Sequence, residues 1–319
     1  MELVTAVLAI VLYLPLQYSD FNFRNKMLRN LYKLLPNGAR DFVRHIDAAL
    51  ASHIQERSRP LDGWYDEYLT FLLHVKGTCH FIANREAATS WETDGAFPRQ
   101  MTAFTRLRGS SDLPVLRQVW EEREYHAVAE YMAKYVYYAT PLHIIDAGAN
   151  VGYATLYLKS AFPNAEVVCL EPDAGSFKQL ERNVAINKLT GVTPLQAGLW
   201  KSESFLEVGR DVGDQMEWSF YVREVPGPSD LRGFSVPYLA RERNWPVIDL
   251  LKIDIEGGER YIFETPELAK SVLENTRFVA IEVHDVYKIR PHIYELLRQN
   301  NIEFFEHGEL TIGRNTSLT

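Results

Sequence analysis

The sequence contains 319 residues, of which 46% are hydrophobic, 12% aromatic and 24% charged. These proportions are typical of a folded globular protein and exclude a disordered tail or a small disulfide-stapled scaffold, and the length allows one large domain or two ordinary ones. The net charge of −8 argues against a broadly basic surface, so no nucleic-acid partner is expected. Only two cysteines occur, Cys79 and Cys169, which favours a reducing, cytoplasmic compartment.

The amino-terminal segment combines an apolar run with a basic flank. The run from Leu3 to Leu16 has 14 residues, whereas a membrane-spanning helix needs about 20. Nothing basic precedes the run, which argues against a secretory signal. Six cations against two acids follow between Asp20 and Arg44. Residues 1–44 therefore predict a helix packed on the protein or on a partner chain, or else peripheral attachment to an anionic membrane surface.

Residues 1–100 are expected to form a mainly helical N-terminal extension. Apolar residues recur at helical spacing within 27–35 and 42–54. The stretch 69–83 is interpreted as a hairpin or as a helix that ends in a strand, and a loop rich in Thr, Gly and Pro is expected over 88–100. This loop is the predicted boundary with a second domain at 101–319.

Strand-like and helix-like segments alternate after residue 101. Strands are predicted at 142–146, 166–170, 192–196, 247–254, 277–283 and 302–305, and helices at 151–161, 176–187, 259–264 and 287–300. This succession predicts an α/β fold with a doubly wound, mainly parallel sheet and helices on both faces. Ligands bind such sheets outside the carboxyl ends of the strands, where the strand order reverses, so the site residues are expected there.

The first predicted ligand site is the turn after the strand at 142–146. Gly148 and Gly152 are spaced as Gly-x-x-x-Gly, which differs from the Gly-x-Gly-x-x-Gly of dinucleotide-binding folds. Glycines let the backbone approach a ligand closely. Asp146 would repel a pyrophosphate and attract a cationic sulfonium, so this turn favours S-adenosylmethionine over NAD.

Later strand ends supply further candidate residues. Glu171 follows the second strand, where a carboxylate can accept hydrogen bonds from both ribose hydroxyls, and Gly198 follows the third, where an adenine edge would lie. The fourth and fifth strands end in an acidic cluster with one histidine, and its candidates are Asp254, Glu256, His284 and Asp285. Such a cluster can hold a general base, a divalent metal, or both.

These motifs together resemble the FkbM family of S-adenosylmethionine-dependent methyltransferases. The resemblance rests on LRGSSDLPVLRQVWEEREY (107–125), IIDAGANVGYATL (144–156), VVCLEPDAGSFKQLERNVAIN (167–187), IDLLKIDIEGGE (248–259) and IEVHD (281–285). It implies a class I methyltransferase (Rossmann-like) fold and methyl transfer to oxygen on sugars, glycans or other glycosylated or polyketide molecules. It also implies cofactor contacts at Asp146, Gly148, Asn150, Gly152 and Glu171.

Transfer to a hydroxyl benefits from a base, and His284 is the first candidate because a neutral imidazole can take a proton near neutral pH. Asp254 would orient it or replace it, with Glu256 as a further carboxylate. In an alternative version, Asp254 and Asp285 hold Mg²⁺, which lowers the pKa of the hydroxyl.

The acceptor site is expected in the insertion before the fourth strand, where Trp218 and Arg223 suit stacking on a sugar and bonding its hydroxyls. Two rival functions are an NAD-dependent oxidoreductase and a non-catalytic binding module that keeps the fold. The sequence leaves homo-oligomer formation open.

Overall fold

The computed structural model describes residues 68, 71, 72, 74, 75, 77–82, 86–93, 99–106, 110–136, 141–210 and 220–318. The chain from Gly63 to Thr319 makes up one compact unit. The apolar run and basic flank within residues 1–44 lie outside the described residues, as does Trp218. Among the residues described, no helix is both long enough and apolar enough to cross a membrane.

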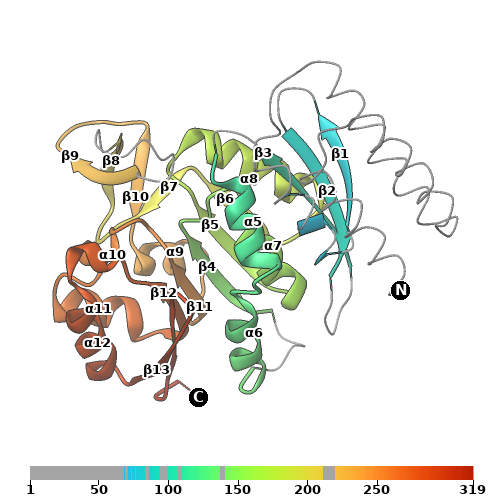
Figure 1. Ribbon diagram of the computed structural model, residues 1–319. Coiled ribbons are helices and arrows are strands. Elements are labelled where there is room, and N and C mark those ends of the chain that lie inside the picture. The colour runs from blue at the N-terminus through green and yellow to red at the C-terminus, as the bar shows by residue number, and fades with distance from the viewer. Residues whose placement is uncertain are drawn as a thin grey trace, which may run out of the picture. The chain divides into compact units, whose positions relative to one another are not determined.

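A seven-stranded sheet forms the centre of the unit, in the order β13-β14-β12-β11-β4-β5-β6 (Figure 1). Its strands are β4 (His143–Ala147), β5 (Glu166–Leu170), β6 (Val192–Leu195), β11 (Ile248–Ile253), β12 (Thr276–Glu282), β13 (Ile302–His307) and β14 (Leu310–Asn315). All neighbouring strands pair in parallel except β14, which is antiparallel to both of its neighbours. From β4 the chain continues outward through β5 to β6, and from β11 it continues to β12 on the other side. The strand order therefore reverses between β4 and β11.

Successive residues of the central strands alternate between two hydrophobic cores, one on each face of the sheet. Ile144, Val167 and Leu250 belong to one core, and Ile145, Val168 and Leu251 belong to the other. The first core includes α5 (Asp112–Trp120), α6 (His126–Ala133), α7 (Tyr153–Ala161) and α8 (Ala174–Ile186); the second includes α9 (Val236–Glu242), α10 (Glu259–Ile262), α11 (Pro266–Leu273) and α12 (Arg290–Gln299). Because helices cover both faces, every residue of β11 is buried.

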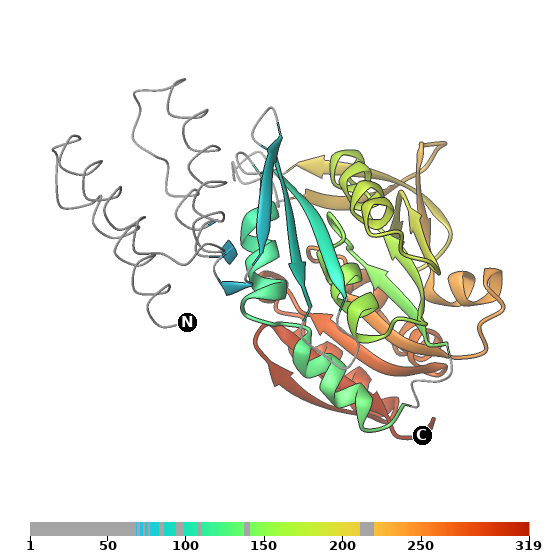
Figure 2. The same ribbon diagram turned by 90° about the vertical axis from the view of Figure 1, so that its right-hand side faces the viewer.

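A three-stranded antiparallel sheet precedes α5 (Figure 2). Its strands are β1 (Thr78–Ile82), β2 (Glu86–Glu92) and β3 (Gln100–Arg106). Side chains of α8 bond the outer edge of β3: the amide oxygen of Asn187 accepts from the backbone nitrogen of Thr102 at 2.7 Å, and that of Asn183 accepts from the nitrogen of Phe104 at 2.7 Å. These asparagines satisfy backbone donors that a fourth strand would otherwise pair.

A four-stranded sheet in the order β7-β10-β8-β9 forms the insertion before β11. It consists of β7 (Ala197–Leu199), β8 (Ser204–Arg210), β9 (Phe220–Val225) and β10 (Leu231–Phe234). Leu206, Trp200 and Leu231 form a small core of its own. The insertion therefore carries its own packing beside the main sheet.

The sequence located most of the central sheet but not the smaller sheets. The expected α/β doubly wound, mainly parallel architecture is confirmed, and β5 has the predicted bounds. The predicted loop over 88–100 is wrong, because β2 extends to Glu92 and β3 begins at Gln100. Residues 78–82 and 86–92 are strands, so the described part of the expected helical extension is not mainly helical. Tyr68, Phe71 and Leu72 are helical and β1 follows, which decides between the two interpretations of 69–83 in favour of a helix ending in a strand.

Candidate active site

A cavity of about 370 Å³ opens at the carboxyl ends of β4, β5 and β11, where the strand order reverses. Its size is in the range of small-molecule sites. It is lined by Arg106, Ser111, Gly148, Asn150, Glu171, Pro172, Asp173, Gly175, Ser176, Gly198, Leu199, Trp200, Val222, Asp254, Ile255, Glu256 and Gly258. The segments that meet here lie far apart in the sequence, and the parallel sheet brings their ends to one edge.

The turn after β4 forms the floor of the cavity. Gly148 has φ +74°, and a side chain there would collide with the carbonyl oxygen of Asp254, so a glycine is required for β4 and β11 to approach. Asn150 also has a positive φ, 49°, which asparagine tolerates better than most residues. Of the predicted glycines, Gly148 lines the cavity whereas Gly152, with φ +90°, faces Leu180 and starts α7.

Glu171 projects from the end of β5 and its carboxylate is held in place by the backbone. The nitrogens of Asn150 and Asp173 each donate to one of its oxygens at 2.8 Å. Burial raises the pKa of Glu171 to about 7, against the lowering effect of these two hydrogen bonds. Each carboxylate oxygen has a second lone pair, so the group can still accept hydrogen bonds from a ligand.

Asp146 does not line the cavity. Its side chain is fully buried, accepts a hydrogen bond from the Thr155 hydroxyl at 2.6 Å, and forms an ion pair with the ammonium of Lys252 at 3.2 Å. A carboxylate paired in this way does not present an open negative charge to a sulfonium. The expected direct attraction between Asp146 and a cationic ligand is therefore not supported by the geometry.

Lys252, to which sequence reasoning gave no role, connects the parts of this edge. Its ammonium donates to the carbonyl oxygen of Gly148 at 2.7 Å and also lies 3.4 Å from the carboxylate of Asp254. Burial alone would lower the pKa of Lys252, but Asp146 and Asp254 outweigh it and raise that pKa. The charged lysine thus fixes the β4 turn against the end of β11. Its one signal in the sequence is a cation inside a strand that is apolar apart from Asp249.

The predicted base, His284, has carboxylates on both sides of its ring. Its Nδ1 lies 2.9 Å from Glu259 and its Nε2 lies 3.4 Å from Glu256. Burial alone would lower the pKa of His284, but the hydrogen bonds to Glu256 and Glu259 outweigh it and raise the pKa to about 11. The expectation of a neutral imidazole near neutral pH is therefore wrong, since these carboxylates stabilise the imidazolium. Asp254 and Glu256 line the cavity, whereas His284 does not.

Two glutamates that sequence reasoning missed lie beside this cluster. Glu282, the last residue of β12, has a pKa raised to about 8, mainly by burial and then by the charge of Asp254. Burial and the charge of Asp254 also raise the pKa of Glu124 to about 7. Glu124 lies within the motif 107–125, but the motif indicates no role for it, because only the fold brings the segment after α5 close to Asp254. Both carboxyls can exchange a proton near neutral pH.

The residues that could hold a cation differ from those expected. Ligand atoms of Asp254, Glu282 and His284 lie within 4.8 Å of one another. Asp285 contacts Arg290 and is not part of this group. Its two oxygens accept hydrogen bonds from Arg290 at 2.7 and 2.9 Å, and its side chain is 66% exposed. Arg290 lowers the pKa of Asp285. The structure thus does not bring Asp285 to Asp254 as the magnesium version expected.

Of the predicted acceptor residues, Arg223 lies on β9 with its side chain 61% exposed and paired with Glu207. It does not line the cavity, whereas its neighbour Val222 does. Gly198, predicted at the adenine end, lines the cavity together with Leu199 and Trp200 of the same segment. The four-stranded insertion therefore reaches the cavity through β7 and β9.

The sheet order and the cavity at the reversal of that order define a class I methyltransferase fold. Residues 146–304 match the model of the FkbM methyltransferase domain. The chain belongs to the FkbM methyltransferase family, and this membership implies S-adenosylmethionine as the cofactor.

Curated proteins and solved structures with similarity to the chain are also methyltransferases. Methyltransferase sdnD of Sordaria araneosa is 28% identical over 192 residues, which cover 50% of this chain and 73% of that protein. Methyltransferase 1 of Beauveria bassiana is 26% identical over 135 residues, 40% of this chain and 50% of that protein. The METTL16 methyltransferase domain has a TM-score of 0.40 at 14% identity, covering 61% of this chain and 67% of that one. Precorrin-6y C5,15-methyltransferase of Geobacter metallireducens has a TM-score of 0.35 at 12% identity, covering 66% of this chain and 90% of that one.

Proposed function

We propose that the protein transfers a methyl group from S-adenosylmethionine to a hydroxyl oxygen of a small acceptor, namely a sugar, a glycan or another glycosylated or polyketide molecule. One observation carries the proposal: the backbone-held carboxylate of Glu171 and the carboxylates of Asp254 and Glu256 line the same cavity. The first suits a ribose and the others suit a reacting hydroxyl. When bound, the cofactor supplies an electrophilic methyl group on a positively charged sulfur.

The residues present fit this cofactor better than NAD. Four carboxylates line the cavity, those of Glu171, Asp173, Asp254 and Glu256, and they would repel the pyrophosphate of a dinucleotide. A sulfonium and an ammonium would instead be attracted. In the proposal, Glu171 accepts hydrogen bonds from the ribose, Gly148 and Asn150 contact the cofactor along the β4 turn, and Gly198 lies beside the adenine. Asp146 and Gly152 do not line the cavity and instead stabilise the conformation of that turn.

The proposed base is Asp254. It lines the cavity, and the ammonium of Lys252 lies 3.4 Å from its carboxylate. Its carboxylate takes the proton of the acceptor hydroxyl and then releases it to solvent. Glu282, with its pKa raised to about 8, is mostly protonated at neutral pH and so adds little negative charge beside this base. His284, as an imidazolium, positions Glu256 at the cavity wall. Alignment of the two reactants supplies the remaining acceleration.

The acceptor is expected to enter beside the insertion, where Trp200 and Val222 contribute apolar wall. Trp218 and Arg223 remain proposals for acceptor binding. Aromatic surface beside carboxylates suits a ring that carries hydroxyls.

Product analysis with ¹³C-methyl-labelled S-adenosylmethionine tests the proposal. A panel of glycosylated and polyketide acceptors is incubated with the protein, and the ¹³C chemical shift of the transferred methyl distinguishes oxygen from nitrogen and carbon. We expect an oxygen-bound methyl, and a decrease in kcat of about 10²- to 10⁴-fold in Asp254→Asn. The matched control Asp285→Asn, an exposed carboxylate paired with Arg290, should keep wild-type turnover. A methyl on nitrogen or carbon, or cofactor binding without any transfer across the panel, would contradict the proposal.

A further inference from the structure

Arg106 is the one cation among the described residues that line the cavity, whereas four carboxylates line it. It is the last residue of β3, in the segment before the first cofactor motif. An anionic group of a ligand would be repelled along most of this wall. Only near Arg106 would it meet a positively charged hydrogen-bond donor.

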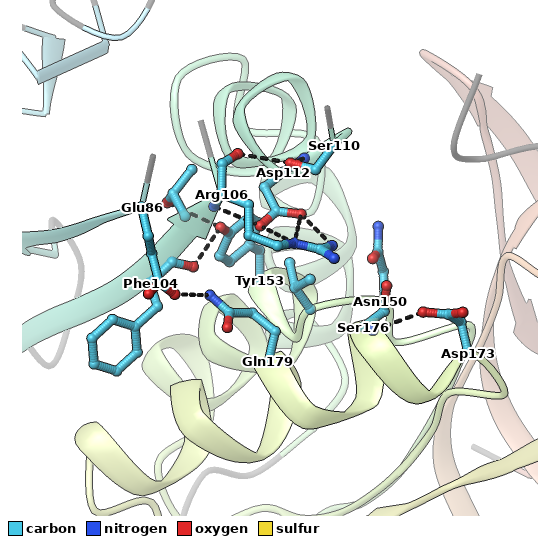
Figure 3. Close-up of polar contacts among 12 residues, drawn as sticks. Glu86, Phe104, Arg106, Ser110, Asp112, Asn150, Tyr153, Asp173, Ser176 and Gln179 are labelled. Atoms are coloured by element: carbon cyan, nitrogen blue, oxygen red, sulfur yellow. Dashed lines mark hydrogen bonds and ion pairs between the residues drawn. The ribbon is translucent and has the colours of Figure 1, made fainter. Parts of the chain in front are cut away.

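Asp112 holds the guanidinium of Arg106 in a defined orientation. The Asp112 side chain is fully buried, and it accepts from Arg106 Nη2 at 2.7 Å, from Nε at 3.0 Å and from the backbone nitrogen at 2.8 Å (Figure 3). Nη1 points toward the start of α8, since a side-chain carbon placed on Gly175 would lie 3.9 Å from it. Asn150 and Ser176 line the same cavity as Arg106.

Ser111, five residues further along, is a second donor in the same wall. It occupies the N-cap position of α5, where a serine hydroxyl ordinarily bonds a backbone nitrogen of the first turn, but its side chain makes no capping hydrogen bond. Its side chain lines the cavity and the residue is 9% exposed. The hydroxyl therefore does not cap its own helix, and Ser111 contributes a polar residue to the cavity wall.

We propose that Arg106 and Ser111 bind the carboxylate of the methionine moiety of S-adenosylmethionine. This inference rests on the cofactor assumed in the proposed function. The cofactor carries one carboxylate and two cationic centres, which matches a wall with one cation and several acids. The segment from β3 to α5 thereby becomes part of the cofactor site, although it precedes the glycine-containing turn by about 40 residues.

Calorimetric titration with S-adenosylmethionine and with its decarboxylated analogue tests this assignment. The analogue keeps the sulfonium and the amine but lacks the carboxylate. Arg106→Gln should weaken binding of S-adenosylmethionine about 10- to 100-fold and leave the affinity for the analogue within about twofold of wild type. Ser111→Ala should show the same selectivity with a smaller loss. The control Arg182→Gln removes an arginine that also pairs with a carboxylate, that of Glu86, but does not line the cavity, so it should change neither affinity.

Loss of Arg106 leaves Asp112 buried without its cation, so Arg106→Gln alone can fail to fold. The double variant Arg106→Gln/Asp112→Asn removes both charges and gives the same prediction. Equal weakening of both ligands in a folded variant, or no weakening of either, would overturn the assignment. An unchanged cofactor affinity with a raised acceptor KM would overturn it too, because the carboxylate would then belong to the acceptor. The titration contains no acceptor, so a methyl found on nitrogen would contradict the proposed function without affecting this result.

Discussion

At the scale of single residues, the site depends on charged groups buried deeply enough that each needs its partner. Lys252 contacts two carboxylates and two backbone carbonyl oxygens while its residue is 1% exposed. Glu171 is 7% exposed and relies on two backbone nitrogens. Desolvation is costly for such groups, so their removal should affect stability as well as ligand binding.

Lys252→Met should lower the free energy of unfolding by about 3 to 5 kcal/mol, because it leaves Asp146 buried without a cation. The double variant Asp146→Asn/Lys252→Met removes both charges and should recover part of that loss. Chemical denaturation monitored by tryptophan fluorescence measures both. A double variant that is less stable than Lys252→Met would show that the uncompensated charge of Asp146 is not the cause.

Stability should also depend on pH through Glu171. The folded-state pKa is about 7 and the ordinary value 4.5, so the folded protein binds this proton more tightly than the unfolded chain does. The carboxyl therefore contributes stability that is fully present below pH 4.5 and is lost as the pH rises toward 7. In Glu171→Gln, the decrease in unfolding free energy between about pH 5 and pH 8 should be smaller by about 2 to 3 kcal/mol than in wild type.

Denaturation curves at both pH values measure this difference. The unfolding free energy at pH 5 alone is no test, because glutamine also changes the hydrogen bonds to Asn150 and Asp173. An identical pH dependence in wild type and variant would show that Glu171 does not titrate in this range.

At the scale of elements, α8 completes the edge of β3. The amide of Asn183 is fully buried and bonds both the nitrogen of Phe104 and the carbonyl oxygen of Val151, the latter at 2.8 Å. Asn187 bonds both backbone groups of Thr102, at 2.7 and 2.6 Å. Two asparagines one helical turn apart thus align the sheet that carries Arg106 with the helix that follows Glu171.

Asn183→Ala should destabilise the protein by about 1 to 3 kcal/mol, because it removes a fully buried amide and leaves the nitrogen of Phe104 without this acceptor. Asn187→Ala, at a partly exposed position, should cost less. Thermal unfolding of both variants measures the order. If Asn187→Ala were the more damaging change, the burial argument would be contradicted.

The strands of the central sheet can be predicted from the sequence more readily than those of the smaller sheets. Residues 166–170 read as a strand because the run Val167 to Leu170 is apolar and ends at Glu171-Pro172. β2 alternates buried and half-exposed residues, but its Ala and Ser residues favour strands little, and Gly95 and Pro98 follow closely. The sequence of 88–100 therefore predicts a loop. Its strand state is stabilised by pairing with β1 and β3, which no local pattern reveals.

The residues of the candidate site likewise divide into those that a local sequence pattern reveals and those that depend on the tertiary fold. Gly148, Glu171, Asp254 and Glu256 were predictable because each lies within three residues of the end of a strand of the parallel sheet. Arg106 and Glu124 were not assigned a role, since their approach to the site depends on tertiary contacts. Glu282 lies at a strand end, but its raised pKa depends on burial and on Asp254, which the sequence does not reveal. His284 was located correctly at the end of β12, but its charge state depends on Glu259, which lies 25 residues earlier in the chain.

At the scale of the whole molecule, the cavity gathers segments from Arg106 to Gly258 onto one edge of the sheet. Acidic side chains dominate its wall, which makes two ligand classes worth separating by experiment: a divalent cation and a cationic cofactor. Both would be attracted by the same carboxylates.

Removal of metal ions tests whether a divalent cation is needed in addition to the cofactor. Both ring nitrogens of His284 contact carboxylates, and a metal could bind the ring only after a proton and one of these contacts are lost. A cation at Asp254, Glu282 and His284 would therefore compete with partners that are already in place. Treatment with EDTA should therefore leave methyl transfer unchanged, and added Mg²⁺ should not increase it. Loss of turnover that Mg²⁺ or Mn²⁺ restores would contradict this expectation and favour the metal-assisted version.

The central claim is that the cavity between the ends of β4, β5 and β11 binds S-adenosylmethionine through Glu171. Calorimetric titration of the wild-type chain and of Glu171→Ala with S-adenosylhomocysteine and with NAD tests it most directly. We expect one site for S-adenosylhomocysteine, a loss of at least about tenfold in affinity in Glu171→Ala, and no binding of NAD. Binding of NAD in place of S-adenosylhomocysteine, or an unchanged affinity in a folded Glu171→Ala variant, would contradict the claim.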